Sequence, residues 1–268
     1  MLKFSRPAKL LLAAAVTVPL VGCAHGNKSR LDTAYVARDV SSLYTAAQKA
    51  MNNGQYEQAA KLYDEVERQH PYSIWARRAQ LMSGFNYYLA EKYSDAVSSA
   101  QRFITIHPGS AEAAYAQYLI AMSYYQQIPD VSRDQTTTQQ ALDAFGELVR
   151  RYPDTHYAAD ARLKLDLIND HLAGKEMAVG RYYERAGQWL AATYRFRNVI
   201  DSYQTSSDTP EALERLVECY LALGMPEEAR KAGAVLGRNY AGSFYYRQAL
   251  KLLGQDSKLI QRRTASRK

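Results

Sequence analysis

The sequence predicts an all-α fold for the mature chain, a solenoid of about five helical hairpins. Two proline-containing dipeptides lie at a regular spacing, because His70-Pro71 recurs 37 residues later as His107-Pro108. Before each of them runs an apolar pattern of helical period, with small and aromatic residues at fixed offsets. No segment alternates apolar and polar residues as a half-buried strand would. These observations favour stacked helix pairs over a fold that contains a sheet.

The turn inside each hairpin has its own signature. Residues 54–63, 91–100 and 187–196 each carry an aromatic residue third and an alanine sixth. This pattern resembles the turn between helices A and B of tetratricopeptide (TPR) repeats, so a TPR-type helical-hairpin solenoid is expected. In such repeats small residues occupy the points where two helices approach closely. A proline ends the second helix because it cannot continue one.

The predicted repeats follow one another along the chain. The first three end at prolines: Pro71, Pro108 and Pro153. The third is longer than the others because it contains an eight-residue insertion within 128–138. The fourth and fifth cover about 173–204 and 210–241. Residues 157–172 have a helical pattern and are predicted to continue into the fourth repeat as one long helix.

The N-terminus has the features of an export signal. A cationic stretch with Lys3, Arg6 and Lys9 precedes an apolar run at residues 10–20. This run is too short for a membrane-spanning helix, which needs about 20 residues. It ends in Leu-Val-Gly-Cys at residues 20–23, which resembles the lipobox of bacterial lipoproteins.

The lipobox resemblance implies that residues 1–22 are a cleaved signal peptide. Cys23 would then carry a diacylglyceryl group on its thiol and a fatty acyl group on its amine, and several such chains anchor firmly at about 0.8 kcal/mol per buried CH₂. Ala24 follows the cysteine in place of aspartate, which implies sorting to the outer membrane with the folded part facing the periplasm. Residues 23–39 are then a lipidated tether, and no cofactor besides these covalent lipid groups is expected.

The net charge of +7 does not indicate a nucleic-acid-binding protein. Residues 1–22 contribute +3 and residues 256–268 contribute +4, so the body between them is close to neutral. Nucleic acid is therefore not expected as a partner. Residues 255–268 are predicted to form a basic, disordered tail.

No residue pattern indicates catalysis or metal binding. The five histidines show no metal-ligand spacing such as H-E-x-x-H, and the chain has no G-x-S-x-G, glycine-rich phosphate loop or C-x-x-C. Cys219 lies in an apolar helical pattern, where a free cysteine behaves as a small buried hydrophobe. The sequence therefore predicts a binding protein rather than an enzyme.

In a TPR array the A helices line a concave groove, and here the groove positions are rich in aromatic residues. The predicted groove residues are Tyr44, Phe85, Tyr88, Tyr118, Met122 and Tyr125. Such a surface favours a peptide ligand with apolar or aromatic side chains over the acidic tails that other TPR modules clamp. For Tyr88 and Tyr125 a packing role is an open alternative, because each follows a ring assigned to the core.

Three segments make the resemblance more specific: 130–142, 150–162 and 172–200. Together with the lipobox and the repeats, they resemble the BamD family of outer-membrane assembly lipoproteins over nearly the whole mature chain. The resemblance implies a non-catalytic scaffold of the β-barrel assembly machinery (BAM complex). Its partners would be the POTRA domains of BamA, other BAM lipoproteins and C-terminal segments of unfolded outer-membrane proteins.

The resemblance also divides the repeats by role. Residues 40–153, repeats one to three, would form the substrate side. Residues 154–254, the long helix with repeats four and five, would form the partner side, with Arg195 and Arg197 as candidate contacts to BamA. Arg195 is the preferred candidate, because it matches an arginine typical of the family. Arginine suits such a contact because it can pair bidentately with a carboxylate. A solvated cationic face is the alternative for either arginine.

Two other classes are compatible with parts of the sequence. A periplasmic TPR lipoprotein that scaffolds peptidoglycan or cell-division enzymes would share the repeats and the lipobox, but not the insertion or the 172–200 block. An envelope hydrolase would need a nucleophile site, for which the sequence has no pattern.

Overall fold

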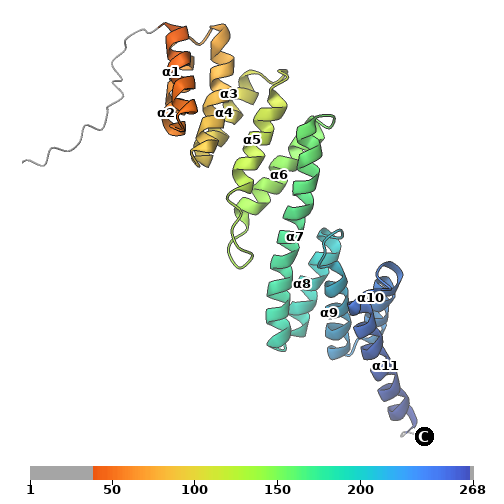
Figure 1. Ribbon diagram of the computed structural model, residues 1–268. Coiled ribbons are helices and arrows are strands. Elements are labelled where there is room, and N and C mark those ends of the chain that lie inside the picture. The colour runs from red at the N-terminus through yellow and green to blue at the C-terminus, as the bar shows by residue number, and fades with distance from the viewer. Residues whose placement is uncertain (1–38, 266–268) are drawn as a thin grey trace, which may run out of the picture. The chain divides into compact units, whose positions relative to one another are not determined.

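The computed structural model describes residues 39–265, with side chains as far as Gly254, and it confirms the all-α prediction (Figure 1). Over this range the chain forms eleven helices and no strand. Their bounds are α1 Val40–Asn52, α2 Tyr56–Gln69, α3 Ile74–Leu89, α4 Tyr93–Ile106, α5 Ala113–Tyr125, α6 Thr136–Arg151, α7 His156–Arg185, α8 Trp189–Ser202, α9 Thr209–Ala222, α10 Pro226–Asn239 and α11 Phe244–Ala265. The predicted signal peptide, Cys23 and the tether up to residue 38 lie outside the described residues.

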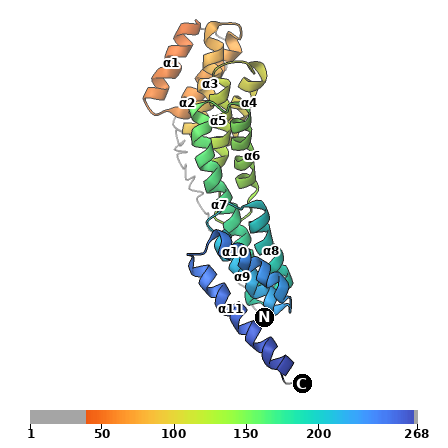
Figure 2. The same cartoon turned by 90° about the vertical axis from the view of Figure 1, so that its right-hand side faces the viewer.

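Each helix packs against the next from α1 to α11, as the run of colours in Figures 1 and 2 shows. Alternate helices also touch: α1 with α3, α3 with α5, α5 with α7, and α9 with α11. The first helices of neighbouring hairpins therefore lie side by side. This is the solenoid arrangement, in which each hairpin buries its apolar face against its neighbours.

In four of the hairpins the inner turn contains one residue with a positive φ angle. Gly54, Gly187 and Gly224 take this position with φ angles of 75°, 71° and 73°. Glycine is favoured there because it lacks the Cβ atom that would clash. In the second hairpin Glu91 occupies the same position with a φ of 59°. In the third, residues 126–135 connect α5 to α6, which confirms the longer connection predicted there.

The second helix of each hairpin ends at a histidine or tyrosine. The C-cap residues of α2, α4, α6, α8 and α10 are His70, His107, Tyr152, Tyr203 and Tyr240. Their φ angles fall between −126° and −136°, so the chain leaves the helical conformation in the same way five times. Prolines follow three of these caps, and a proline cannot continue a helix because it has no N–H to donate.

The buried side chains form three clusters. The first lies between α1, α2 and α3 and includes Leu43, Tyr63 and Val66. The second extends from α4 to the first half of α7 and includes Phe103, Phe145, Leu148 and Ile168. The third extends from the second half of α7 to α11 and includes Met177, Phe196, Val199, Cys219 and Leu236. Cys219 is fully buried, as its apolar surroundings in the sequence predict.

Helix α7 is the long helix predicted from the sequence, and it has 30 residues. It begins after Thr155, whose Oγ1 accepts a hydrogen bond from the Ala158 amide at 3.2 Å. Ile168 on its first half belongs to the second cluster, and Met177 on its second half belongs to the third. One helix therefore joins the first three hairpins to the last two.

Helix α11 corrects the expectation of a disordered tail from residue 255, because it continues to Ala265. Its start is capped by Ser243, whose Oγ accepts a hydrogen bond from the Tyr246 amide at 3.0 Å. No proline follows to end the helix, and Gly254 is tolerated within it at a cost of about 1 kcal/mol. Among residues 39–265, no helix is both long and apolar enough to cross a membrane.

Candidate functional site

Seven half-buried side chains on three neighbouring helices form a surface that we name the aromatic strip. Its members are Phe85 and Tyr88 on α3, Tyr115, Tyr118, Met122 and Tyr125 on α5, and Tyr157 on α7. The four residues on α5 are three or four positions apart, which places them on one face of the helix. The strip is continuous because α5 contacts both α3 and α7.

The rings of the aromatic strip contact one another across helices. The ring centroid of Tyr157 lies 5.5 Å from that of Tyr115 and 5.1 Å from that of Tyr118. On the other side, the Phe85 centroid lies 6.4 Å from that of Tyr115. These distances fall in the range of favourable aromatic pairs, each of which contributes about 0.5–1.5 kcal/mol beyond its buried area.

Residues beneath and beside the aromatic strip hold several of its side chains in place. Tyr118 and Tyr125 approach the fully buried Phe145 edge-on, with ring centroids 6.3 Å and 6.0 Å from its own. Gln126 donates a hydrogen bond from Nε2 to the Tyr88 hydroxyl oxygen at 3.0 Å. The strip is therefore a preorganised surface whose rings have fixed neighbours and remain partly exposed. Tyr88 and Tyr125 pack against the second cluster and keep exposed area, so both a packing and a binding role stay open for them.

Two charged residues on α7 lie at one edge of the strip. The Tyr118 hydroxyl donates a hydrogen bond to Asp160 Oδ2 at 2.7 Å. Lys164 Nζ lies 3.4 Å from the same oxygen and 5.2 Å from the Tyr125 ring centroid. Burial, and then the hydrogen bond to Asp160, raise the pKa of Tyr118 above its usual range, so this tyrosine remains a neutral donor. This edge of the strip therefore carries an ion pair, whose ammonium group also faces the Tyr125 ring.

Tyr44 does not belong to the aromatic strip, which corrects the expectation that it lines a groove. Its side chain is only 8% exposed. Its ring centroid lies 4.8 Å from Trp75 and 5.3 Å from Tyr63. Trp75 lies in the first turn of α3 and packs against the Tyr44 ring. A residue that lines a groove would instead be exposed to solvent on that side. Tyr44 is therefore a core residue of the first hairpin.

Tyr157 is a strip member outside the groove positions predicted from the sequence, because residues 157–172 were assigned to a connecting helix. A repeated capping pattern could have identified it. At three helix starts a capping serine or threonine is followed two residues later by an aromatic residue: Ser73 to Trp75, Thr155 to Tyr157, and Ser243 to Tyr245. In each place the hydroxyl caps a helix that stacks in the array. The aromatic residue then lies at the second helical position, facing the preceding hairpin.

The two arginines predicted to contact a partner differ in their surroundings. Arg195 Nη1 lies 3.2 Å from Glu176 Oε2 on α7, so its charge is compensated within the fold. Arg197 is exposed and has no ion-pair partner among the residues that the structure describes. Leu190 and Tyr194 lie on the same face of α8 and are 74% and 71% exposed. Arg197 is therefore an available cation on an exposed apolar helix face.

The sequence matches a family model described as YfiO, outer membrane lipoprotein, over residues 36–236. The chain belongs to this family. The match includes the whole aromatic strip and α8, and it confirms the resemblance to the BamD family that segments 130–142, 150–162 and 172–200 indicate.

Several relatives are similar over most of the chain. The outer membrane protein assembly factor BamD of Caulobacter vibrioides is 49% identical over 251 residues, which are 94% of this chain and 82% of that protein. The protein of the same name from Rickettsia prowazekii is 41% identical, over 91% of this chain and 96% of that protein. The BamD of Neisseria meningitidis serogroup A is 33% identical, over 88% and 92%. Among solved structures, MamA aligns with a TM-score of 0.37 at 19% identity, over 82% of this chain and 94% of MamA.

Proposed function

We propose that this protein is a non-catalytic scaffold in outer-membrane β-barrel assembly, held at the membrane by lipid on Cys23 with its repeats in the periplasm. The aromatic strip carries this proposal, because it is a partly exposed surface of rings with fixed neighbours on a member of a family of outer membrane lipoproteins. A relative that is 49% identical is named an outer membrane protein assembly factor. The strip consists of tyrosines, a phenylalanine and a methionine, which bind by contact and hydrogen bonding.

The ligand proposed for the strip is the C-terminal segment of an unfolded outer-membrane protein. The BamD resemblance implies such segments, which typically end in an aromatic residue. A further ring can add to the tilted pairs already present on α3, α5 and α7. The hydroxyls of Tyr88 and Tyr118 can bond the peptide backbone, and Lys164, which pairs with Asp160 in the free protein, can also pair with a terminal carboxylate.

The exposed face of α8 is proposed to contact a POTRA domain of a BamA-type partner. Leu190 and Tyr194 offer apolar area, and Arg197 offers a cation without a partner in the described part of the fold. An exposed apolar patch beside an arginine is typical of an interface centre. Other BAM lipoproteins are proposed as further partners through the family alone.

Titration with a synthetic peptide tests the strip. The peptide should end in phenylalanine, and a second peptide ending in alanine should serve as its control. The double substitution Tyr88→Ala/Tyr125→Ala should weaken binding of the first peptide by about 2–4 kcal/mol, taking about 1–2 kcal/mol for each partly buried ring. Tyr194→Ala is the matched control, because it removes an exposed ring on α8 and should leave peptide binding unchanged.

Thermal melting separates binding from packing. Phe145→Ala removes a fully buried ring and should lower the free energy of unfolding by about 3–5 kcal/mol. The double substitution should cost less than this, since its rings are only half-buried. A double variant that binds the peptide as tightly as wild type and melts as early as Phe145→Ala would show that the two rings serve packing alone.

A further inference from the structure

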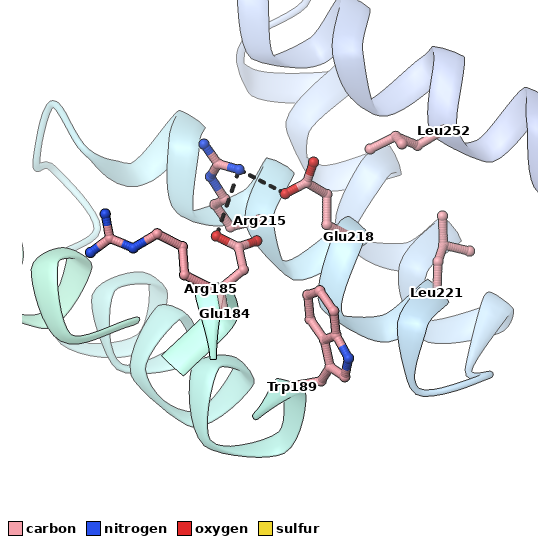
Figure 3. Close-up of a pocket in the computed structure, with 7 residues that line it drawn as sticks. All are labelled: Glu184, Arg185, Trp189, Arg215, Glu218, Leu221 and Leu252. Carbon is pink, nitrogen blue, oxygen red and sulfur yellow. Dashed lines mark hydrogen bonds and ion pairs between the residues drawn. The ribbon is translucent and has the colours of Figure 1, made fainter. Parts of the chain in front are cut away.

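A pocket of about 420 Å³ lies among the end of α7, the start of α8, and helices α9 and α11. Trp189, Leu221 and Leu252 form its apolar wall. Glu184 and Glu218 lie at its polar end together with Arg215, which Figure 3 shows between the two carboxylates. The pocket is remote in sequence from the aromatic strip, and it does not include the exposed face of α8.

The polar end of the pocket holds more carboxylates than cations. Arg215 Nη1 lies 2.8 Å from Glu218 Oε2 and 3.6 Å from Glu184 Oε2, and its Nε lies 3.8 Å from Glu214 Oε2. The nearby Arg181 does not neutralise Glu184, Glu214 or Glu218, because both of its hydrogen bonds go to Glu211, each at 2.8 Å. Arg215 Nε also lies 3.5 Å from Glu211 Oε1, so Arg215 faces four carboxylates and shares one of them with Arg181. Four carboxylates and two guanidiniums give this cluster a formal charge of −2.

Two of these carboxylates are largely buried. The side chains of Glu184 and Glu214 are only 12% and 7% exposed. Glu184 Oε1 is buried and has no hydrogen-bond partner. Burial, and then the neighbouring Glu218, raise the pKa of Glu184 to about 7, which reflects the cost of this uncompensated charge. Arg185 lines the rim, but its guanidinium points away from the carboxylates in Figure 3.

We propose that this pocket binds an arginine side chain presented by a segment of a partner protein. The aliphatic stem would lie against Leu221 and Leu252, and the guanidinium would reach Glu218 and the Trp189 ring. Arginine fits better than a neutral side chain because its planar fork can donate two hydrogen bonds to one carboxylate. A further cation at this end of the pocket would leave three guanidiniums for the four carboxylates. The site does not depend on the assembly role proposed above.

The pocket can be tested through the ring that lines it. The chain has two tryptophans, Trp75 and Trp189, so labelling with 5-fluorotryptophan produces two fluorine resonances. The variant Trp75→Phe assigns them. The probe is the peptide acetyl-Gly-Ser-Arg-Ser-Gly-amide, and its control replaces arginine by citrulline, which has the same shape without the charge.

The Trp189 resonance should shift saturably with the arginine peptide, while the Trp75 resonance stays fixed. The citrulline peptide should bind about tenfold more weakly, because a hydrogen bond to a charged group contributes about as much as a tenfold change in Kd. Equal shifts with both peptides would overturn the proposal. A Trp189 resonance that stays fixed up to on the order of 10 mM arginine peptide would overturn it as well.

Two isosteric substitutions test which carboxylate of the pocket binds the arginine side chain. Glu218→Gln should weaken binding of the arginine peptide about tenfold, and Glu184→Gln is a second variant should the first not fold. Glu227→Gln on α10 is the matched control, because Glu227 is an exposed carboxylate paired locally with Arg230, and it should leave the Kd unchanged. Folded Glu218→Gln and Glu184→Gln variants that both bind as wild type does would contradict the site.

Discussion

The backbone of Gly180 on α7 lies directly against the ring of Phe196 on α8. A Cβ atom at Gly180 would be only 2.5 Å from Cε1 of Phe196. Phe196 is fully buried in the third cluster, so its ring has no free space to move into. The glycine therefore sets how closely the two helices of the fourth hairpin approach each other.

Gly180→Ala should lower the free energy of unfolding by about 1–3 kcal/mol, because the added methyl group overpacks the contact between α7 and α8. Urea denaturation measures the change. Gly146→Ala on α6 is the matched control, since a Cβ atom there would meet nothing within 4 Å. It should stabilise the protein by about 0.5–1 kcal/mol through helix propensity. Equal effects of the two substitutions would contradict the close approach.

Glu214 predicts a dependence of stability on pH. Burial, and then the neighbouring Glu218, raise its pKa from 4.5 to about 7. Below about pH 4.5 the carboxyl group holds its proton in both the folded and the unfolded state. Between about pH 4.5 and 7 mainly the unfolded state has released it, so this group's contribution to stability falls as the pH rises. Above pH 7 the folded state carries the full penalty of a buried charge.

Glu214→Gln should therefore raise the melting temperature at pH 8 and change it little at pH 4.5. The expected gain at pH 8 is about 1–3 kcal/mol, which follows from the size of the pKa shift. Melting curves at both pH values measure it. Glu227→Gln on α10 controls for the loss of an exposed carboxylate and should show the same small effect at both. A gain for Glu214→Gln that is equally large at pH 4.5 would rule out this charge as its cause.

Replacement by glutamate should have different effects at Arg195 and Arg197, because only Arg195 has an ion-pair partner within the described fold. At Arg195 it should affect stability, and at Arg197 it should affect partner binding. Arg195→Glu places a second carboxylate beside Glu176, so it should lower the free energy of unfolding by about 1 kcal/mol. Arg197→Glu alters an exposed residue, and its melting temperature should stay near that of wild type. Only Arg197→Glu should weaken co-purification of a BamA-type partner without loss of stability. Normal recovery of the partner with Arg197→Glu would count against the α8 surface.

The lipid anchor has a direct test. Cys23→Ser removes the thiol that would receive the diacylglyceryl group, so the protein should move from the membrane pellet to the soluble fraction or remain as an uncleaved precursor. Fractionation followed by immunoblotting measures this. Cys219→Ser is the control for loss of a thiol, because Cys219 is buried in the third cluster and should leave the fractionation unchanged. A Cys23→Ser protein that stays in the pellet with its leader removed would contradict the lipobox.

The sequence by itself determined the helical hairpins, their turns and the long helix. These features depend on residues close together in the chain, such as Gly187 in a positive-φ turn or Pro71 after a helix end. Local backbone preference and apolar periodicity are sufficient to specify them. The small residue at Gly180 was also readable, because the repeat places one wherever two helices must approach.

Tertiary structure decided which of the predicted site residues are accessible. Tyr44 and Tyr88 are both predicted to line the groove, but Trp75 from the next hairpin covers Tyr44, whereas Tyr88 keeps exposed area. Arg195 lies two positions before Arg197, and only Arg195 meets a carboxylate of α7.

The carboxylates around Arg215 show the same limit. Glu184 on α7 and Glu218 on α9 are far apart in the chain, and packing brings them to one guanidinium. Exposure and charge compensation depend on side chains contributed by neighbouring helices. A repeat pattern specifies where each helix begins and ends, but not which side chain of the next helix will lie over it.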